Sequence, residues 1–227
     1  MDLRNDGKII DEFYAYIRRD SSVCVGAKGA LAKDNIRVMV LEQFDDEKNS
    51  QEILNFAYNF IREYRESKDG LHSMVFIFKE PVMTNEAAFE EMLWGSLQSL
   101  SDLDAARYGY DKRVSADPSS PTFSFSLMEE AFFIIALHPS SSRMARRFTY
   151  PALVFNPHAQ FEEMKKKGTY QKVKKVNRER DIKLSGSINP MLKDFGESSE
   201  IFQYSGAQHN ADWECPFKIN HQNNERN

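Results

Sequence analysis

One histidine in this sequence stands where an apolar run gives way to an expected helix. The stretch LVFNPHAQFE (153–162) ends its apolar part in an Asn-Pro pair, and His158 follows directly. With Asn156 as the helix cap, the imidazole would lie in the first turn, where the helix dipole disfavours imidazolium and leaves the neutral form that a metal binds. Phe161 and Met164 continue the same helix face, so the competing interpretation is a histidine buried in the core.

A cluster of arginines follows another apolar run. The stretch LHPSSSRMARRF (137–148) leaves an expected strand at His138 and then carries Arg143, Arg146 and Arg147 in close succession. Guanidinium groups bind carboxylates in a bidentate manner, so this loop is suited to a substrate carboxylate or to the propionates of a haem. The alternative is a solvated loop whose arginines form surface salt bridges.

Cysteine provides a third type of candidate ligand. The chain has 2 cysteines, Cys24 and Cys215, near opposite ends, which favours reduced thiols over a disulfide framework. Cys215 lies in WECPF (213–217), where a thiolate could serve as a soft iron ligand. A cysteine between aromatic residues is also a common buried hydrophobic residue. The sequence has no histidine or cysteine spacing typical of zinc sites and no glycine-rich phosphate loop.

The composition disfavours several classes of partner. A chain of 227 residues with 28% charged residues and a net charge of −4 is typical of a single soluble domain without attraction to nucleic acid or anionic membranes. The basic stretch 165–180 contains one aromatic residue, Tyr170, and is interpreted as a solvated helix face. No apolar run reaches the length of a membrane span, and the N-terminus is charged where a signal peptide is hydrophobic, so we expect a cytoplasmic protein.

Helical and strand patterns interleave along the chain. Helices are expected at 8–19, 50–66, 84–104, 157–168 and 169–184, strands at 36–41, 72–78 and 152–155, and a hairpin from 123–127 and 131–137. The expected fold class is α/β or α+β, a single mixed domain over 1–227 with a central sheet flanked by helices. Gly, Ser, Asn and Pro predict a loop-rich tail over 185–227.

Several long motifs resemble the YqcI/YcgG family. FNPHAQFE and NPMLKDFGESSE are the most specific, and VCVGAKGAL, MLWGSLQSLSDLD, HPSSSRMARRF, QYSG and WECPF extend the match over about residues 22–218. Characterised members of this family are haem-dependent N-oxygenases that hydroxylate the nitrogen of arginine or of a related guanidine. The resemblance implies a haem b cofactor. It also implies oxygen with an external electron donor, or a peroxide, because the chain has no flavin or nicotinamide motif.

The resemblance also implies roles for particular residues. Its expected site consists of His158 as axial ligand (alternatives Cys215 and His138), of Arg143, Arg146 and Arg147 for haem propionates or a substrate carboxylate, and of Gln203 and Tyr204 on the distal side. The expected activity is oxidation of the nitrogen of an amino acid or a related small amine, with an external reductase as a partner.

Two departures from the family pattern bear on the substrate. Val23 replaces a proline in the first motif, and Phe202 and Ala207 stand where family members carry arginine. If that segment lines the active site, we expect a substrate that is less polar at its far end than arginine. Two other functions remain open, namely a non-catalytic haem carrier or sensor, and an interaction protein without haem.

Overall fold

The core of the computed structural model is a five-stranded mixed sheet with the strand order β1-β2-β5-β4-β3. The structure describes residues 3–43, 49–67, 69–82, 85–210 and 212–221. The strands are β1 (Ile36–Leu41), β2 (Ser73–Phe78), β3 (Phe125–Leu127), β4 (Glu130–Leu137) and β5 (Ala152–Pro157). Because β1 and β2 are parallel and the other pairs are antiparallel, the sheet is mixed, as expected for a single compact α/β domain.

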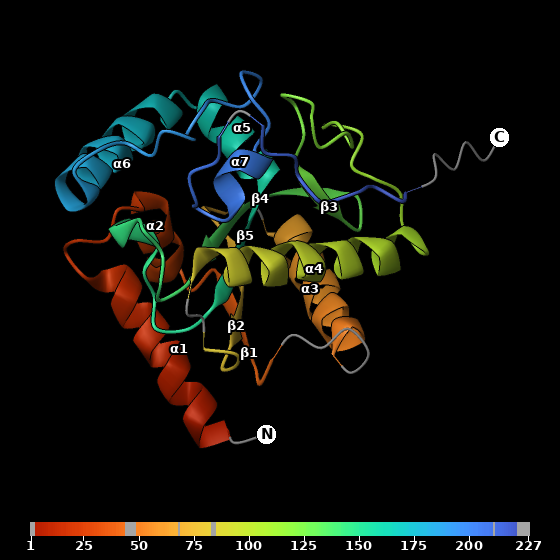
Figure 1. Ribbon diagram of the computed structural model, residues 1–227, viewed down its shortest axis with the longest axis horizontal. Helices are drawn as coiled ribbons and strands as arrows, with labels where there is room; N and C mark the ends of the chain where they lie inside the picture. Colours follow the sequence, from red (N-terminus) through yellow and green to blue (C-terminus); the bar gives the residue numbers. More distant parts are fainter. Residues whose placement is uncertain (1–2, 44–48, 68, 83–84, 211, 222–227) are drawn as a thin grey trace.

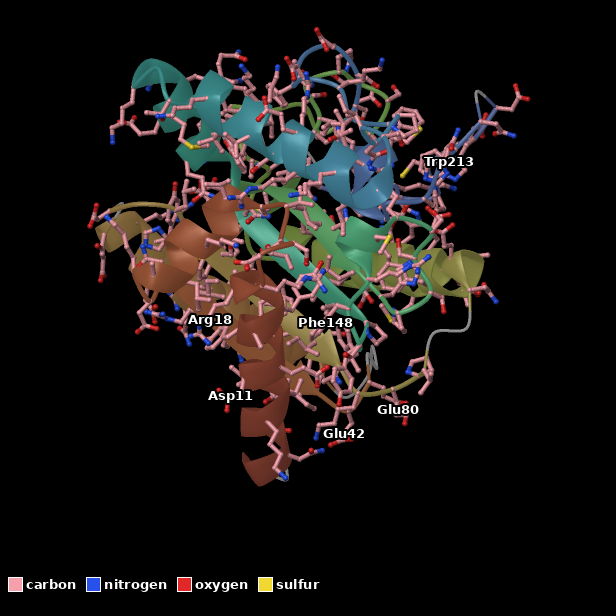
Figure 2. All side chains as sticks on the ribbon, turned by 90° about the vertical axis from the view of Figure 1, so that its left-hand side faces the viewer. Asp11, Arg18, Glu42, Glu80, Phe148 and Trp213 are labelled. Carbon is pink, nitrogen blue, oxygen red and sulfur yellow. The ribbon has the colours of Figure 1, made fainter. Side chains whose placement is uncertain are left out.

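Helices cover both faces of this sheet (Figure 1). They are α1 (Leu3–Arg18), α2 (Val25–Ala32), α3 (Ser50–Glu66), α4 (Glu86–Ala105), α5 (His158–Lys166), α6 (Tyr170–Ser185) and the short α7 (Ile201–Tyr204), with a 3₁₀ turn, η1, at Met144–Arg146. In Figure 1, α3 and α4 lie on one side of the strands, and α1 and α2 lie on the other. Figure 2, viewed from the side of α1, shows α6 crossing above α1 and α2.

One face of the sheet, called here the packed face, is fully covered by α3 and α4. It carries Phe76, Phe132, Ile134, Leu153 and Phe155, which are each at most 1% exposed. The apolar residues of α3 recur at helical spacing and are buried against this face, as the sequence predicts. Asn85 caps α4 by accepting a hydrogen bond from the Ala88 backbone N–H, so this helix also begins where the sequence indicates.

The opposite face, called here the hollow face, is covered less completely. Alternate residues of the same central strands, Phe133 and Ile135 of β4 with Val154 and Asn156 of β5, remain partly exposed although helices lie over them. Central strands between helix layers are normally buried on both faces. Their partial exposure therefore marks empty space between the sheet and the helices α1, α2 and α6.

The start of α5 differs from the expectation. Asn156 was expected to cap the helix and Pro157 to begin it, whereas β5 continues through Pro157 and the helix begins at His158. Asn156 instead accepts a hydrogen bond from the Ser73 hydroxyl and donates one to the Phe133 carbonyl, bridging neighbouring strands. Because the Asn156 side-chain amide bonds to the neighbouring strands, it does not cap the helix. His158 still occupies the first helical position.

Two other segments refine the sequence-based picture. The helix α2 was not predicted, because VGAKGALA contains two glycines, which weaken helical propensity. Residues 186–210 and 212–221 of the tail are mainly loops, with α7 as the helix among them. Ile201, Tyr204 and Phe217 of this tail are buried in the same core cluster as the packed face, so the tail is part of the domain. No helix in the described part of the chain is long and apolar enough to cross a membrane.

Candidate functional site

A cavity of about 220 Å³ lies among α5, α6 and the segment before α7; we call it the helix cavity. Its apolar walls include Phe133, Phe161 and Phe195, and His158 contributes a polar group. Among the cations that line it are Lys165, Lys174 and Arg178. The combination of aromatic walls, an imidazole and basic side chains suits a flat, partly anionic organic ligand.

The His158 imidazole is buried at the wall of this cavity without a hydrogen bond to any described residue. The side chain is 9% exposed, and its ring centroid lies 4.4 Å from that of Phe195. The nearest carboxylate oxygen is Oε1 of Glu200, at 3.8 Å from the imidazole Nε2, which is beyond hydrogen-bond distance. No described residue bonds either ring nitrogen, so both are available to a ligand in the space that the imidazole borders.

Burial drives His158 and Glu200 toward their neutral forms. Desolvation lowers the pKa of the His158 imidazole to about 4 and raises the pKa of the Glu200 carboxyl to about 8. Between these values both groups are uncharged, so their contact is not an ion pair at neutral pH. The Ser124 hydroxyl donates to Oε2 of Glu200, which fixes the carboxyl beside the imidazole. Two titratable groups shifted in opposite directions beside one cavity are typical of a functional site.

His158 also borders an open groove of about 910 Å³ on the outer side of α5. The groove and the helix cavity share His158, Met164, Lys165 and Phe195. Small-molecule sites typically have volumes of roughly 300–1,000 Å³. Together, the groove and the helix cavity exceed the lower end of that range. A ligand held at His158 therefore has space on more than one side of the ring.

A second cavity, of about 250 Å³, lies between α1 and the hollow face; we call it the sheet cavity. Its wall on the sheet includes Val75, Ile135 and Val154. It adjoins the helix cavity, and the residues that line both are Val23, Phe133, Asn177, Asp181 and Leu192. The two cavities therefore meet at α6 and at Phe133 in the middle of β4.

The predicted arginines are placed differently from one another. Arg143 and Arg146 line the sheet cavity. Arg143 forms an ion pair with Asp181, with 2.7 Å between Nη2 and Oδ2. Arg146 instead donates to three backbone carbonyls, those of Ala136, Gln203 and Tyr204. Arg147 is exposed, donates to the Ser141 carbonyl and lines neither cavity. The structure thus brings two of the three arginines to the hollow face.

The alternative axial ligands, His138 and Cys215, lie apart from both cavities. His138 follows β4 and stacks on Phe89 of α4 at 4.1 Å, and burial lowers its pKa to about 4. Cys215 packs against the core cluster of the packed face, and burial raises the pKa of its thiol to about 11. Neither residue is near the space that His158 borders, so the three candidates do not form one site.

Gln203 and Tyr204, predicted to line the distal side, also separate. Gln203 borders the helix cavity and donates a hydrogen bond to the Lys193 carbonyl. Tyr204 is fully buried, borders neither cavity, and its hydroxyl accepts a hydrogen bond from the Phe125 backbone N–H. Tyr204 is therefore placed as a structural residue that joins α7 to β3.

The two residues that replace the family arginines, Phe202 and Ala207, border neither cavity. Phe202 packs against Trp213 with a centroid distance of 5.4 Å, and Ala207 is buried. Their apolar character serves packing, so it does not by itself define the substrate.

Several residues that the sequence-based reasoning missed do border the cavities. They are Glu200 in the helix cavity, Cys24 in the sheet cavity, and Asp181 in both. Glu200 and Cys24 lie inside motifs that resemble the family, which is the signal that could have drawn attention to them. Asp181 of α6 also lies in a stretch that resembles the family, GTYQKVKKVNRERD (168–181), but this charged sequence predicts a solvated helix face, and only the fold buries the carboxylate.

The comparisons with known proteins support one assignment. No curated protein and no solved structure matches the chain. The model of the YqcI/YcgG family matches residues 13–218, which includes the strands of the sheet, both cavities and the tail that covers the packed face. A match over nearly the whole chain means that this protein belongs to the YqcI/YcgG family.

Proposed function

We propose that this protein is a haem-dependent monooxygenase that oxidises the nitrogen of an amino acid or a related small amine. The observation that carries the proposal is the His158 imidazole, buried, neutral and without a hydrogen bond at the wall of an aromatic cavity. A neutral imidazole with a free nitrogen is what iron ligation requires. The family resemblance supports haem as the group that this imidazole would bind.

The remaining residues beside His158 fit a haem by their chemistry. Phe133, Phe161 and Phe195 offer flat apolar surface to a porphyrin. Lys165, which borders both the helix cavity and the groove, and Arg178, whose buried Nε has no partner among the described residues, can pair with propionates. A porphyrin is larger than the helix cavity alone, so it would also use the groove that shares His158.

Glu200 is suited to positioning the axial imidazole. Ligating histidines usually pair their second ring nitrogen with a carboxyl, a carbonyl or water, which fixes the ring and tunes its basicity. Glu200 stands 3.8 Å from Nε2 and is held by Ser124, so a small shift of either side chain would complete a hydrogen bond. One oxygen of its carboxyl can accept a hydrogen bond from the N–H of the second ring nitrogen, which leaves the lone pair of the other nitrogen for iron.

Bound haem would supply the activation of dioxygen. In the overall reaction one oxygen atom is added to the amine nitrogen, and the other leaves as water with two electrons and two protons from an external reductant. A peroxide could replace both dioxygen and reductant. The chain's own part is to hold the amine near the helix cavity and to keep bulk water away with the aromatic walls.

Haem titration tests the proposal directly. We expect wild-type protein to saturate at one haem per chain, His158→Ala to lose most of this binding, and His138→Ala and Cys215→Ala to keep it. Consumption of an amino acid by the loaded protein, with reductant and dioxygen, then tests catalysis. Absence of a saturable Soret band would exclude haem binding. Stoichiometric haem without turnover of any amine would point to a carrier or sensor.

A further inference from the structure

We propose that the sheet cavity binds an α-amino acid with an apolar side chain, holding its carboxylate at Arg146 and its ammonium at Asp181. Both charged residues line this cavity. Binding of such a zwitterion does not depend on haem. That the bound amino acid is the substrate rests on the proposed function.

Arg146 is a cation without an acidic partner. Its guanidinium donates to three backbone carbonyls, at 2.9–3.3 Å, and forms no ion pair with any described carboxylate. A guanidinium has five N–H donors, so donors remain after these bonds are made. Burial lowers its pKa to about 10, which leaves it charged at neutral pH. A guanidinium charge that no carboxylate bonds directly is costly beside an apolar cavity, and a ligand carboxylate would compensate it.

Asp181 supplies the opposite charge nearby. Its Oδ2 accepts hydrogen bonds from Arg143 and from the Asn189 backbone N–H, whereas its buried Oδ1 has no partner among the described residues. A carboxylate oxygen left unpaired in the interior favours a cationic ligand group. Arg146 can thus donate hydrogen bonds to the carboxylate of an amino acid, and Asp181 can accept them from its ammonium group.

The rest of the sheet cavity is apolar. Val75, Ile135 and Val154 of the sheet and Phe13 of α1 line the space away from α6. A volume of about 250 Å³ is small and suits a compact ligand rather than a large one. A second charge placed against these side chains would lose its hydration without a partner. The cavity therefore favours an aliphatic side chain over the guanidinium of arginine.

The position of Asp181 relates this ligand to the proposed chemistry. Asp181 borders both cavities, so an ammonium group bound at its Oδ1 lies at their junction, toward the cavity that contains His158. The amino acid would then present its nitrogen to the helix cavity and its side chain to the sheet. This polarity agrees with oxidation at nitrogen.

Calorimetric titration of the haem-free full chain with L-leucine tests the proposal. Three analogues probe the ligand without altering the protein: L-leucinamide lacks the carboxylate, 4-methylpentanoic acid lacks the ammonium, and L-arginine adds a second charge. We expect the two truncated analogues to bind at least about tenfold more weakly than leucine, since one buried charge–charge contact is worth more than 1.4 kcal/mol. We expect the same of arginine, because its guanidinium would lose its hydration against apolar side chains without a partner. Equal binding of leucine and either truncated analogue would overturn the zwitterion assignment.

Variants locate the site. Val154→Phe should fill the sheet cavity and abolish leucine binding while leaving Arg146 intact, which keeps the test valid if Arg146→Gln fails to fold. Arg147→Gln, an exposed neighbour that lines neither cavity, is the matched control and should bind normally. Undiminished binding by Val154→Phe would place the ligand elsewhere. Leucine binding with these properties in a chain that takes up no haem would leave this proposal standing and reject the proposed function alone.

Discussion

The two faces of the central sheet are built from alternating residues of the same strands, but they are packed in different ways. Ile134 and Phe155 on the packed face are completely buried, whereas their chain neighbours Ile135 and Val154 on the hollow face remain partly exposed beneath helices. The alternation of strand side chains separates the two environments within one residue. The packed face is filled, whereas the hollow face is filled only in part: Val75 and Ile77 are buried in a core cluster with α1, and space remains beneath α6.

The difference has a cause in the covering elements. On the packed face, α3 and α4 present long apolar stripes, and the tail adds Phe217 and Tyr204. On the hollow face, α6 has few apolar residues, and polar contacts fix it to the start of α2 and to the loop before it. Asn177 accepts from the Val25 backbone N–H, and Arg180 donates to the Ser22 carbonyl. A polar helix held by such contacts does not fill the space below it, so two cavities remain.

The largest expected effect on the free energy of unfolding comes from truncating one isoleucine on each face of the sheet. Ile134→Ala should lower the free energy of unfolding by about 3–5 kcal/mol, because it creates a cavity in a filled core. Ile135→Ala should cost less than about 1.5 kcal/mol, because its side chain already borders empty space. Urea unfolding of the two variants measures both. Equal losses would show that the hollow face is as tightly packed as the other.

The second expected effect is a pH dependence of stability, which arises from the Glu200 carboxyl beside the helix cavity. Its carboxyl has a pKa near 4.5 when exposed and about 8 in the fold, so above pH 4.5 the folded state binds a proton that the unfolded chain has lost. Stability therefore falls as pH rises to about 8. His138 and His158, whose pKa values are lowered to about 4, oppose this only below about pH 6.5.

Among the described groups with a shifted pKa, Glu200 alone titrates between pH 6.5 and 8, and we expect its contribution to wild-type stability to fall by about 2 kcal/mol over this range. Glu200→Gln, which keeps the shape without the titration, should remove this slope. Thermal unfolding at several pH values gives the comparison. A slope that persists in Glu200→Gln would mean that another group titrates there.

The smallest expected effect is the difference in stability loss between two variants that each remove one tyrosine hydroxyl, one on each face of the sheet. Tyr58 donates to the buried Asp104 carboxylate on the packed side, so Tyr58→Phe should cost about 2 kcal/mol. Tyr16 donates to the Ala145 carbonyl above the sheet cavity, where Figure 2 also places Phe148 beside α1, and Tyr16→Phe should cost about 1 kcal/mol. The same unfolding assay resolves the two values. A larger loss for Tyr16 would contradict a loosely packed hollow face.

The sequence predicts the packed face better than the hollow one. The apolar spacing of 50–66 and the alternation of 36–41 match α3 and β1, because these patterns reflect burial against a filled core. His158 was identified from its place at a helix start and does border a cavity. Asp181 was not identified, since its burial depends on how α6 lies over the sheet. Arg147 was included as part of the arginine cluster and Tyr204 because of the family resemblance, and neither borders a cavity, since adjacency in sequence does not put side chains on one face.

The claim that haem binds on the hollow side, at His158, is tested most directly by hydrogen exchange of the full chain with and without haem. The account predicts that haem slows exchange in α5, in α6 and in residues 189–195, and leaves α3 and α4 unchanged. Protection confined to α4 and residues 213–217, around His138 and Cys215, with α5 and α6 unaffected, would contradict it.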